Sequence, residues 1–177
     1  NEPKRSIINE NKTHYEKELS YDGIQVEPHL SYSWSDFPLI KDIGILIFEK
    51  FGIKSKYIPF DYCLVNIYDS GKDGIGWHSD REAGETDIMS VSLGCTRDFA
   101  FRGKYKTNNG GRAKPFKLEN GRTIYKSEFV TKLPLESGDV VYMKKGCQNV
   151  FKHTLCRTTS KKKAITPRIN LTYRKYD

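Results

Sequence analysis

Several features are scarce or missing in this sequence. Across its 177 residues, no apolar run approaches the ~18 residues that a membrane-spanning helix needs. There are four cysteines and no CxxC pair, so the spacing does not indicate a disulfide framework. The first residues also lack the apolar stretch of a secretory signal peptide. We therefore expect an intracellular protein, in the nucleus or cytoplasm, that is not secreted and has no membrane partner.

The composition fits one globular domain with a basic surface. Hydrophobic residues make up 37% of the chain and charged residues 29%, a balance that is not typical of a disordered chain. The formal net charge is +8, and it is uneven: residues 1–60 carry −1 and residues 61–177 carry +9. A basic surface suits a polyanion, nucleic acid first among candidates. Charge alone leaves this open, because many basic proteins bind no anion.

Local patterns predict one clear helix followed by many short strands. Ile40, Ile43 and Ile47 fall at helical spacing, which predicts a helix over Phe37–Phe51 with Gly52 at its C-cap. The first ~20 residues are polar and without clear periodicity, so we expect a loose arm or a short helix there. Short β-rich runs follow Pro59: Phe60–Tyr68, Ile88–Leu93, Asp98–Arg102, Glu128–Leu133, Asp139–Met143 and Pro167–Tyr173. This order favours a β-sandwich or jelly-roll braced by a helical layer.

The longest irregular stretch is Gly103–Ser127. It contains seven basic residues and one acidic residue, Glu119. A loop of this length inside a compact domain is usually functional or disordered. Two interpretations stay open, a solvated hairpin and a segment that contacts phosphates.

A candidate metal site begins at His78-Ser79-Asp80. On an extended segment, side chains two residues apart point the same way, so His78 and Asp80 would share a face. His153 is a possible third ligand from a distant part of the chain. Two imidazoles and one carboxylate hold Fe(II) while leaving three coordination positions open. The alternative is a chance pair of surface residues.

The C-terminal strand favours a bound anion. Four polar residues alternate along it and share one face: Arg168, Asn170, Thr172 and Arg174. Buried arginines need anionic partners, and a dicarboxylate such as 2-oxoglutarate would supply them. Asn66 and Tyr68 alternate in the same way and could hydrogen-bond a carboxylate. The alternatives are an edge strand with its arginines in water and, for Asn66 and Tyr68, a role in capping the following turn.

Taken together, these motifs resemble those of a known family. They occur in the order Asn66-x-Tyr68, Ile75-Gly76-Trp77-His78-x-Asp80-x-Glu82, Ser90-Val91-Ser92-Leu93-Gly94, Arg97-Asp98-Phe99, Leu135-x-Ser137-Gly138-Asp139, Met143, His153 and Arg168-x-Asn170-Leu171-Thr172-x-Arg174. From about Phe60 to Lys175 the chain resembles the AlkB family of Fe(II)/2-oxoglutarate-dependent nucleic-acid dealkylases. The resemblance is greatest to the eukaryotic branch that repairs DNA and RNA bases.

The resemblance implies an α+β fold with a double-stranded β-helix (jelly-roll) core and an N-terminal supporting helix or helices. Residues 1–177 would form a single Fe(II)/2-oxoglutarate dioxygenase domain. Within it, residues 1–59 would be a substrate-recognition and helical support region. Residues 60–177 would be the catalytic core with a basic insertion at 103–127.

The resemblance also implies roles for individual residues. The catalytic metal ligands for Fe(II) would be His78, Asp80 and His153. The co-substrate 2-oxoglutarate would contact five residues: Asn66, Tyr68, Arg168, Asn170 and Arg174. Arg168 would pair with its distal carboxylate. The substrate would contact Tyr32, Trp34 and Glu82, with the base between Trp34 and His78. The alternative for Trp34 is an ordinary core tryptophan.

The implied reaction is oxidative demethylation of N-alkylated bases of the 1-methyladenine and 3-methylcytosine type in DNA or RNA. It would consume O2, convert 2-oxoglutarate to succinate and release formaldehyde. The partner would be alkylated single-stranded DNA or RNA, with duplex DNA left open, and the protein a monomer. Two rivals stay open: an oxygenase of the same cofactor class that acts on a protein side chain, lipid or small molecule, and a binding module without turnover.

Overall fold

The structure is a computed structural model of the chain. It describes residues 3–10, 20–21, 24–25, 30–53, 59–80, 83, 85–104, 116–117, 123–124, 130–158 and 167–175. Among these residues, no helix has the length and apolar character required to cross a membrane.

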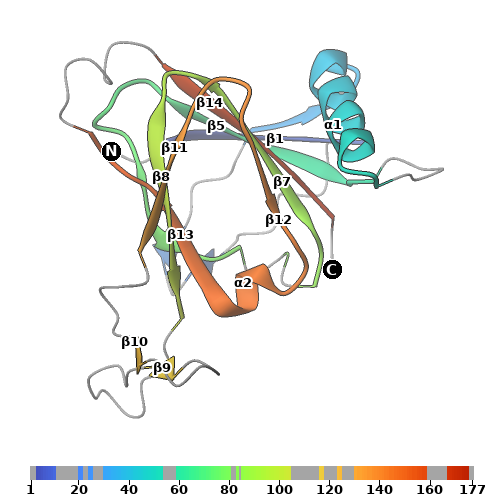
Figure 1. Ribbon diagram of the computed structural model, residues 1–177. Coiled ribbons are helices and arrows are strands. Elements are labelled where there is room, and N and C mark those ends of the chain that lie inside the picture. Colours follow the sequence, from blue (N-terminus) through green and yellow to red (C-terminus); the bar gives the residue numbers. More distant parts are fainter. Residues whose placement is uncertain are drawn as a thin grey trace.

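Two β-sheets face each other and form the core of the molecule (Figure 1). The large sheet has the strand order β12-β7-β14-β5-β1-β4. Its strands are β1 (Lys4–Asn9), β4 (Leu30–Ser33), β5 (Tyr62–Tyr68), β7 (Ile88–Gly94), β12 (Val140–Met143) and β14 (Arg168–Arg174). The small sheet has the order β11-β8-β13-β6. Its strands are β6 (Ile75–His78), β8 (Arg97–Gly103), β11 (Thr131–Leu135) and β13 (Phe151–Leu155). All pairings within these two sheets are antiparallel except that of β1 with β4.

The remaining described elements are short, apart from one helix. Two ribbons pair β2 (Ser20–Tyr21) with β3 (Ile24–Gln25), and β9 (Phe116–Lys117) with β10 (Thr123–Ile124). The helices are α1 (Pro38–Lys50) and the single-turn α2 (Cys147–Val150). Most of the Gly103–Ser127 insertion lies outside the described residues, so the prediction that it contacts phosphates remains a prediction.

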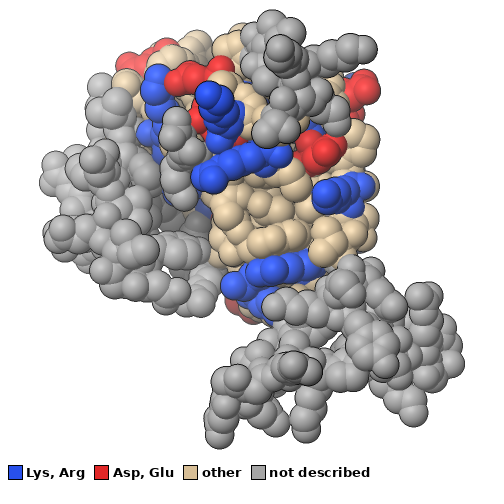
Figure 2. All heavy atoms as spheres, turned by 90° about the vertical axis from the view of Figure 1, so that its left-hand side faces the viewer, with Lys and Arg blue, Asp and Glu red and all other residues tan. Residues whose placement is uncertain are grey.

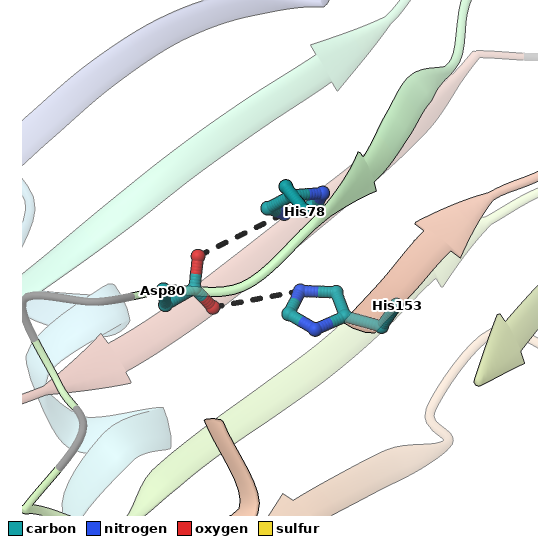
Figure 3. Close-up of side chains that lie close together, drawn as sticks. All are labelled: His78, Asp80 and His153. Carbon is teal, nitrogen blue, oxygen red and sulfur yellow. Dashed lines mark ion pairs between the residues drawn. The ribbon is translucent and has the colours of Figure 1, made fainter. Parts of the chain in front are cut away.

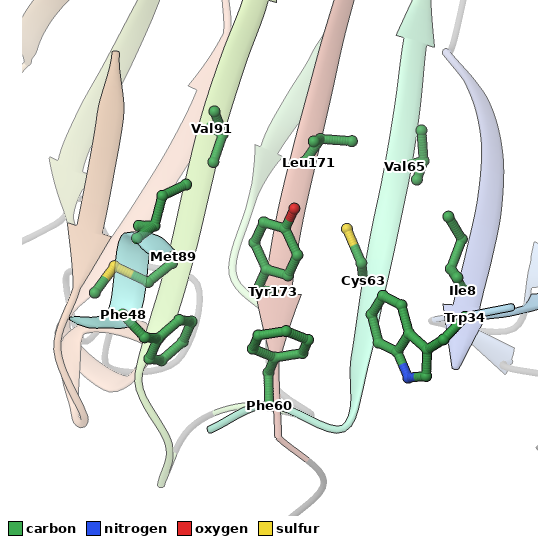
Figure 4. Packing of buried hydrophobic residues seen from close by; sticks show 11 residues of the cluster. Ile8, Trp34, Phe48, Phe60, Cys63, Val65, Met89, Val91, Leu171 and Tyr173 are labelled. Carbon is green, nitrogen blue, oxygen red and sulfur yellow. The ribbon is translucent and has the colours of Figure 1, made fainter. Parts of the chain in front are cut away.

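Helix α1 covers one face of the large sheet and encloses the main hydrophobic cluster (Figure 4). Pro38 suits the first turn because its fixed φ is helical and its missing N–H is not needed there. At the other end, Gly52 adopts a φ of 76°. Its N–H donates to the Glu49 carbonyl at 2.9 Å while Ile53 N–H donates to the Phe48 carbonyl at 3.0 Å, which is a Schellman C-cap. The predicted helix and its C-terminal glycine are therefore confirmed.

Gly44 lets α1 approach the sheet closely. A Cβ at this position would lie 2.5 Å from Tyr173 Cε1 and 2.6 Å from Phe60 Cε1. Both rings belong to the buried cluster, together with Cys63, Met89 and other strand residues (Figure 4). Only hydrogen fits between the helix and these rings, so the packing distance depends on glycine.

The prediction for the N-terminus was wrong. Residues 4–9 form β1, which lies between β5 and β4 in the large sheet, instead of a loose arm or a helix. The strand has no clear alternation in sequence because both of its faces are covered near its end: Ile8 is in the helix-side cluster, and Ile7 and Asn9 are each 2% exposed. The resemblance implies a boundary between residues 59 and 60. Strands β1 and β4 precede this boundary and β5 follows it, yet β1 is hydrogen-bonded to β5 in the same sheet.

Candidate metal and co-substrate site

The two candidate histidine ligands are cross-strand neighbours. His78 ends β6 and His153 lies in β13, and the antiparallel register pairs them directly. Their ring centroids are 4.2 Å apart. Residues paired in this way project to the same face of a sheet, and here that face is turned toward the large sheet. His153 is also stacked on Phe99, at 5.4 Å between centroids.

Asp80 completes the cluster two residues after His78 (Figure 3). Its Oδ1 lies 3.7 Å from His78 Nε2, and its Oδ2 lies 3.5 Å from His153 Nε2. One ligand atom from each of the three residues lies within 4.8 Å of the others. Among the described residues, this is the one group of three or more His, Cys, Asp or Glu side chains arranged to hold a metal.

The protonation states suit metal binding. Burial acts to raise the pKa of the Asp80 carboxyl, but Arg174 and the two imidazoles outweigh it and hold that pKa below its usual value. Arg174 Nη2 lies 3.0 Å from Asp80 Oδ1. Burial lowers the pKa of His153 to about 4, against the attraction of Asp80. At neutral pH the cluster therefore presents a carboxylate and a neutral imidazole, the forms that bind a divalent cation.

A backbone carbonyl sets the tautomer of His78. Its Nδ1 lies 2.7 Å from the Gly76 oxygen, and because a carbonyl only accepts, Nδ1 must carry the proton. Nε2 is then left with its lone pair, and it is the nitrogen that faces Asp80. Such a hydrogen bond on the other ring nitrogen is the usual way in which proteins orient a histidine ligand.

Gln148 holds Asp80 in place, and no local pattern in the sequence marks this role. This side chain is 3% exposed. Its Oε1 accepts the Asp80 N–H at 3.0 Å, and its Nε2 lies 3.3 Å from Met143 Sδ. The Gln148 carbonyl in turn accepts Lys104 Nζ at 2.5 Å. Because α2 leads directly into β13, Gln148 connects the segment that carries Asp80 to the strand that carries His153.

A second contact joins the same segments. Ser79 Oγ donates to the Phe151 carbonyl at 3.1 Å. The residue between the two ligands of the HxD motif is thus tied to the start of β13. Together with the Gln148 contact, it fixes the position of the motif relative to His153.

Arg97 holds the start of β6 to the end of β13. Its side chain is 1% exposed, and its guanidinium donates to four backbone carbonyls, those of Ser70, Gly71, Asp73 and Cys156, at 2.7–3.3 Å. The first three precede β6 and the fourth follows β13. Arg97 stands in the Arg97-Asp98-Phe99 motif, but the sequence alone assigned it no role, since an arginine bound only to carbonyls leaves no pattern of carboxylates to detect.

Arg168 is buried on the inner face of β14 and has no carboxylate partner among the described residues. It is 2% exposed; its Nη2 donates to Ser92 Oγ at 2.8 Å, while its Nε has no partner. The guanidinium carbon lies 5.4 Å from the centroid of the Tyr68 ring. Burial lowers the pKa of this group. A buried guanidinium with an unused donor fits an anionic ligand.

The other predicted co-substrate residues differ in what they can offer. Asn66 is paired with Asn170 across β5 and β14, and its Oδ1 is buried without a partner. Asn170 is engaged in the protein: its Nδ2 lies 2.8 Å from both Ser90 Oγ and the Val91 carbonyl, and its Oδ1 accepts Thr172 Oγ1 at 2.9 Å. Asn170 therefore orders the polar face, and its two amide protons are not available to a ligand.

These residues fit Fe(II) and 2-oxoglutarate. Three donors of the 2-His-1-carboxylate type converge as this metal requires. Arg168 Nε and Asn66 Oδ1 are orphaned buried atoms on the same inner face of the large sheet, as a small polar co-substrate would require. The predicted metal ligands are thus brought together, and Arg174 lies beside Asp80.

Two of the three predicted substrate residues, Tyr32 and Trp34, are not brought to this site. Trp34 is 5% exposed and lies in the helix-side cluster with its ring 5.4 Å from that of Phe60 (Figure 4). Tyr32 packs against the same cluster and meets Phe37 edge to face at 5.3 Å. Both side chains are on the face of the large sheet opposite Arg174. Trp34 thus packs as the alternative of an ordinary core tryptophan describes, and the role of Trp34 and His78 in enclosing the base stays a prediction. Glu82 lies outside the described residues.

Comparisons with known proteins agree with this geometry. The model of the 2OG-Fe(II) oxygenase superfamily matches residues 7–174. The chain is 34% identical over 157 residues to DNA oxidative demethylase ALKBH2 of Arabidopsis thaliana, covering 81% of this chain and 45% of that protein. It is 31% identical over 154 residues to the human protein of that name, covering 82% and 52%. It is 30% identical over 158 residues to human alpha-ketoglutarate-dependent dioxygenase alkB homolog 3, covering 88% and 47%.

The chain spans about half the length of these curated relatives. The solved structure of OsALKBH1 matches 97% of this chain and 77% of its own chain, with a TM-score of 0.52 and 20% identity. This likeness confirms the predicted α+β jelly-roll fold. With the family match over residues 7–174 and the converging triad, the predicted family is confirmed as well: the chain is an AlkB-like member of the 2OG-Fe(II) oxygenase superfamily.

Proposed function

We propose that this protein is an Fe(II)- and 2-oxoglutarate-dependent dioxygenase that demethylates N-alkylated bases of the 1-methyladenine and 3-methylcytosine type in DNA or RNA. One observation carries the proposal. The His78, Asp80 and His153 cluster lies between the same two sheets as the guanidinium of Arg168, which has no carboxylate partner among the described residues. A metal site beside a buried anion site is what a reaction between a bound metal and a dicarboxylate requires.

Each site residue has its own role in the proposed reaction. His78, Asp80 and His153 would hold Fe(II), and Arg174 would keep Asp80 ionised and oriented. Arg168 would bind the distal carboxylate of 2-oxoglutarate, with Asn66 donating beside it through Nδ2, since a carboxylate only accepts. When bound, the metal and co-substrate supply the oxidation of a methyl C–H bond by O2. The resulting N-hydroxymethyl group breaks down to formaldehyde and the unmodified base.

Burial of the site serves this chemistry. Asp80 and His153 are each 5% exposed, so water is largely kept from the reacting atoms. A base within a nucleic-acid strand must leave its stack to reach such a site. Single strands and RNA loops make this easier, because less pairing is lost there.

Two observations support a nucleic-acid substrate. Two of the three relatives described above are named DNA oxidative demethylases. Figure 2 shows the side of the molecule that carries β8, β11 and β13, where Lys and Arg side chains gather above and below an uncharged area. On the outer face of the small sheet, Arg102 and Lys152 are cross-strand neighbours, and Arg102 lies 4.4 Å from the Trp77 ring centroid. Such cations can contact phosphates.

The test is release of formaldehyde and succinate with methylated oligonucleotides. The panel contains 1-methyladenine and 3-methylcytosine in single-stranded DNA, duplex DNA and RNA. We expect turnover with at least one of these substrates and its loss in His153→Ala. Formaldehyde release that survives His153→Ala unchanged would refute the assigned metal site.

The rival substrate class is tested in the same assay. A peptide with methylated lysine and arginine side chains replaces the oligonucleotide. Stimulation of 2-oxoglutarate turnover by the peptide, with none by any methylated oligonucleotide, would show an oxygenase of the same cofactor class with a different substrate.

A further inference from the structure

Buried polar atoms without partners among the described residues include two groups on the inner face of the large sheet. The first group, Asn66 Oδ1 and Arg168 Nε, belongs to the co-substrate site. The second group is at the other side of the sheet, on β1 and β4: both side-chain atoms of Asn9 and the Oγ of Ser31. These strands are one and two places beyond β5 in the sheet order. A co-substrate bound to Arg168 on β14 therefore leaves Asn9 unexplained.

Asn9 faces the metal side of the sheet. Its neighbour Ile8 is in the helix-side cluster (Figure 4), and consecutive strand residues face opposite ways. The register places Asn9 opposite Tyr62, and Tyr62 opposite Arg174. Two strand spacings separate Asn9 from Arg174, or about 10 Å. Arg174 touches Asp80, and the Tyr62 side chain projects to the same inner face between Asn9 and Arg174. A planar base that extends from the metal side to Asn9 would therefore lie against Tyr62, over a distance comparable with the length of a purine.

The burial of Asn9 and its lack of hydrogen-bond partners in the described part of the chain favour a bound ligand. The side chain is 2% exposed, and neither its Oδ1 nor its Nδ2 has a hydrogen-bond partner among the described residues. A buried amide without partners is costly, and native structures rarely keep one unless a ligand or water satisfies it. Since Asn9 projects from the inner face of the large sheet, a ligand that pairs with its amide would lie on that side of the sheet.

We propose that the Asn9 amide reads the edge of the methylated base and favours 1-methyladenine over 3-methylcytosine, an inference that rests on the proposed function. An asparagine amide binds adenine with two hydrogen bonds, accepting from N6–H and donating to N7. Methylation at N1 leaves both of these atoms free. In 3-methylcytosine the N4 amino group lies between the methylated N3 and the C5–H group, so no ring nitrogen can accept a hydrogen bond on the side away from the methyl group. The amide can then make one hydrogen bond instead of two.

The test compares substrates that differ at single atoms. One single-stranded oligonucleotide is made with 1-methyladenine, with 1-methyl-7-deazaadenine, which lacks the N7 acceptor, or with 3-methylcytosine. We expect the wild-type kcat/KM to fall by roughly 5- to 150-fold from 1-methyladenine to its 7-deaza analogue, the range of one bidentate base contact. Equilibrium binding without O2, followed by fluorescence anisotropy, should show the same order.

Two variants assign this discrimination to Asn9. Asn9→Leu has similar volume and no polar atom, and Asn9→Asp keeps the acceptor but loses the donor. Both should treat 1-methyladenine and the 7-deaza analogue alike, and Asn9→Leu should affect 3-methylcytosine much less than 1-methyladenine. Since the replaced amide has no partner, Asn9→Leu should not lower Tm. Asn149→Leu, at an exposed position of α2, is the control and should keep the wild-type preference.

The outcomes separate the inference from the proposed function. If the wild-type protein repairs 1-methyladenine and its 7-deaza analogue equally well, the role of Asn9 is wrong while the proposed function stands. The role is also wrong if Asn9→Leu slows all three substrates by the same factor. If no methylated oligonucleotide yields formaldehyde, both are overturned. The 7-deaza comparison uses the unmutated protein, so it tests the proposed base contact even if a variant fails to fold.

Discussion

Replacing Gln148 tests how the metal ligands are held together. Gln148→Leu removes the acceptor for the Asp80 N–H while keeping a side chain of similar bulk in a position that is 3% exposed. The amide then either stays buried and unpaired or moves to find water and takes the carboxylate with it. The first result costs about 1–3 kcal/mol, and the second misplaces a metal ligand.

The magnitude follows from this choice. If holding Asp80 for the metal requires the unpaired amide, the full cost appears in the binding free energy of the metal. At 1.4 kcal/mol per factor of ten, that is roughly a 5- to 150-fold loss of affinity. Loss of a residue that supports a metal ligand typically weakens binding by about 10- to 100-fold, which agrees.

The assay is an anaerobic titration with Co(II), followed by its visible absorption, which does not depend on turnover. Gln148→Glu keeps an acceptor at the same position and should bind metal far better than Gln148→Leu. Asn149→Ala, whose amide reaches only Glu85 at 3.4 Å, is the matched control and should behave as wild type. Wild-type Co(II) affinity in Gln148→Leu would refute the reasoning, whatever happens to Tm.

Three further predictions follow from the site and the fold. Arg168→Lys should raise the 2-oxoglutarate concentration for half-maximal turnover by about tenfold or more, because an ammonium cannot reproduce the planar fork of the guanidinium; an unchanged requirement would place the co-substrate elsewhere. Gly44→Val should lower the free energy of unfolding by about 1–3 kcal/mol in urea titrations, since its side chain would overlap Tyr173 and Phe60; full stability would show that the helix can shift. Shortening the Gly103–Ser127 segment should weaken binding to all oligonucleotides about equally and flatten its salt dependence; an effect on one sequence alone would mean that the segment reads bases.

The sequence predicted those parts of the site that depend on local spacing. His78 and Asp80 are two residues apart, and the alternation of Arg168 to Arg174 placed both arginines on one face. Both relations depend only on the local strand geometry and not on how the rest of the chain folds. His153 could be proposed only as a possible third ligand from a distant part of the chain. Its position opposite His78 depends on the register of β6 with β13, which no local pattern fixes.

Contacts between distant segments could not be predicted. Gln148 meets Asp80 across 68 positions, and nothing near either residue marks the pairing. Trp34 was assigned by resemblance, and its burial in the helix-side cluster depends on β4 extending the large sheet with Tyr32 on its helix side, which no local pattern predicted. Likewise, β1 was missed because Ile7 and Ile8 are both buried, one on each face, so the alternation that marks a half-buried strand is absent.

The large sheet turns its polar face inward, and this explains why polar residues carried the functional signal. On β14, Leu171 and Tyr173 pack in the helix-side cluster while Arg168 and Arg174 face the small sheet. The cluster beneath α1 supplies apolar burial without occupying the space between the sheets. That space can then hold charged and amide side chains whose desolvation would otherwise be costly. Polar groups there are tolerated only if something pairs with them. Within the described ranges, Arg168 Nε and the Asn9 amide are left without partners there, and a polar or anionic ligand would pair with them.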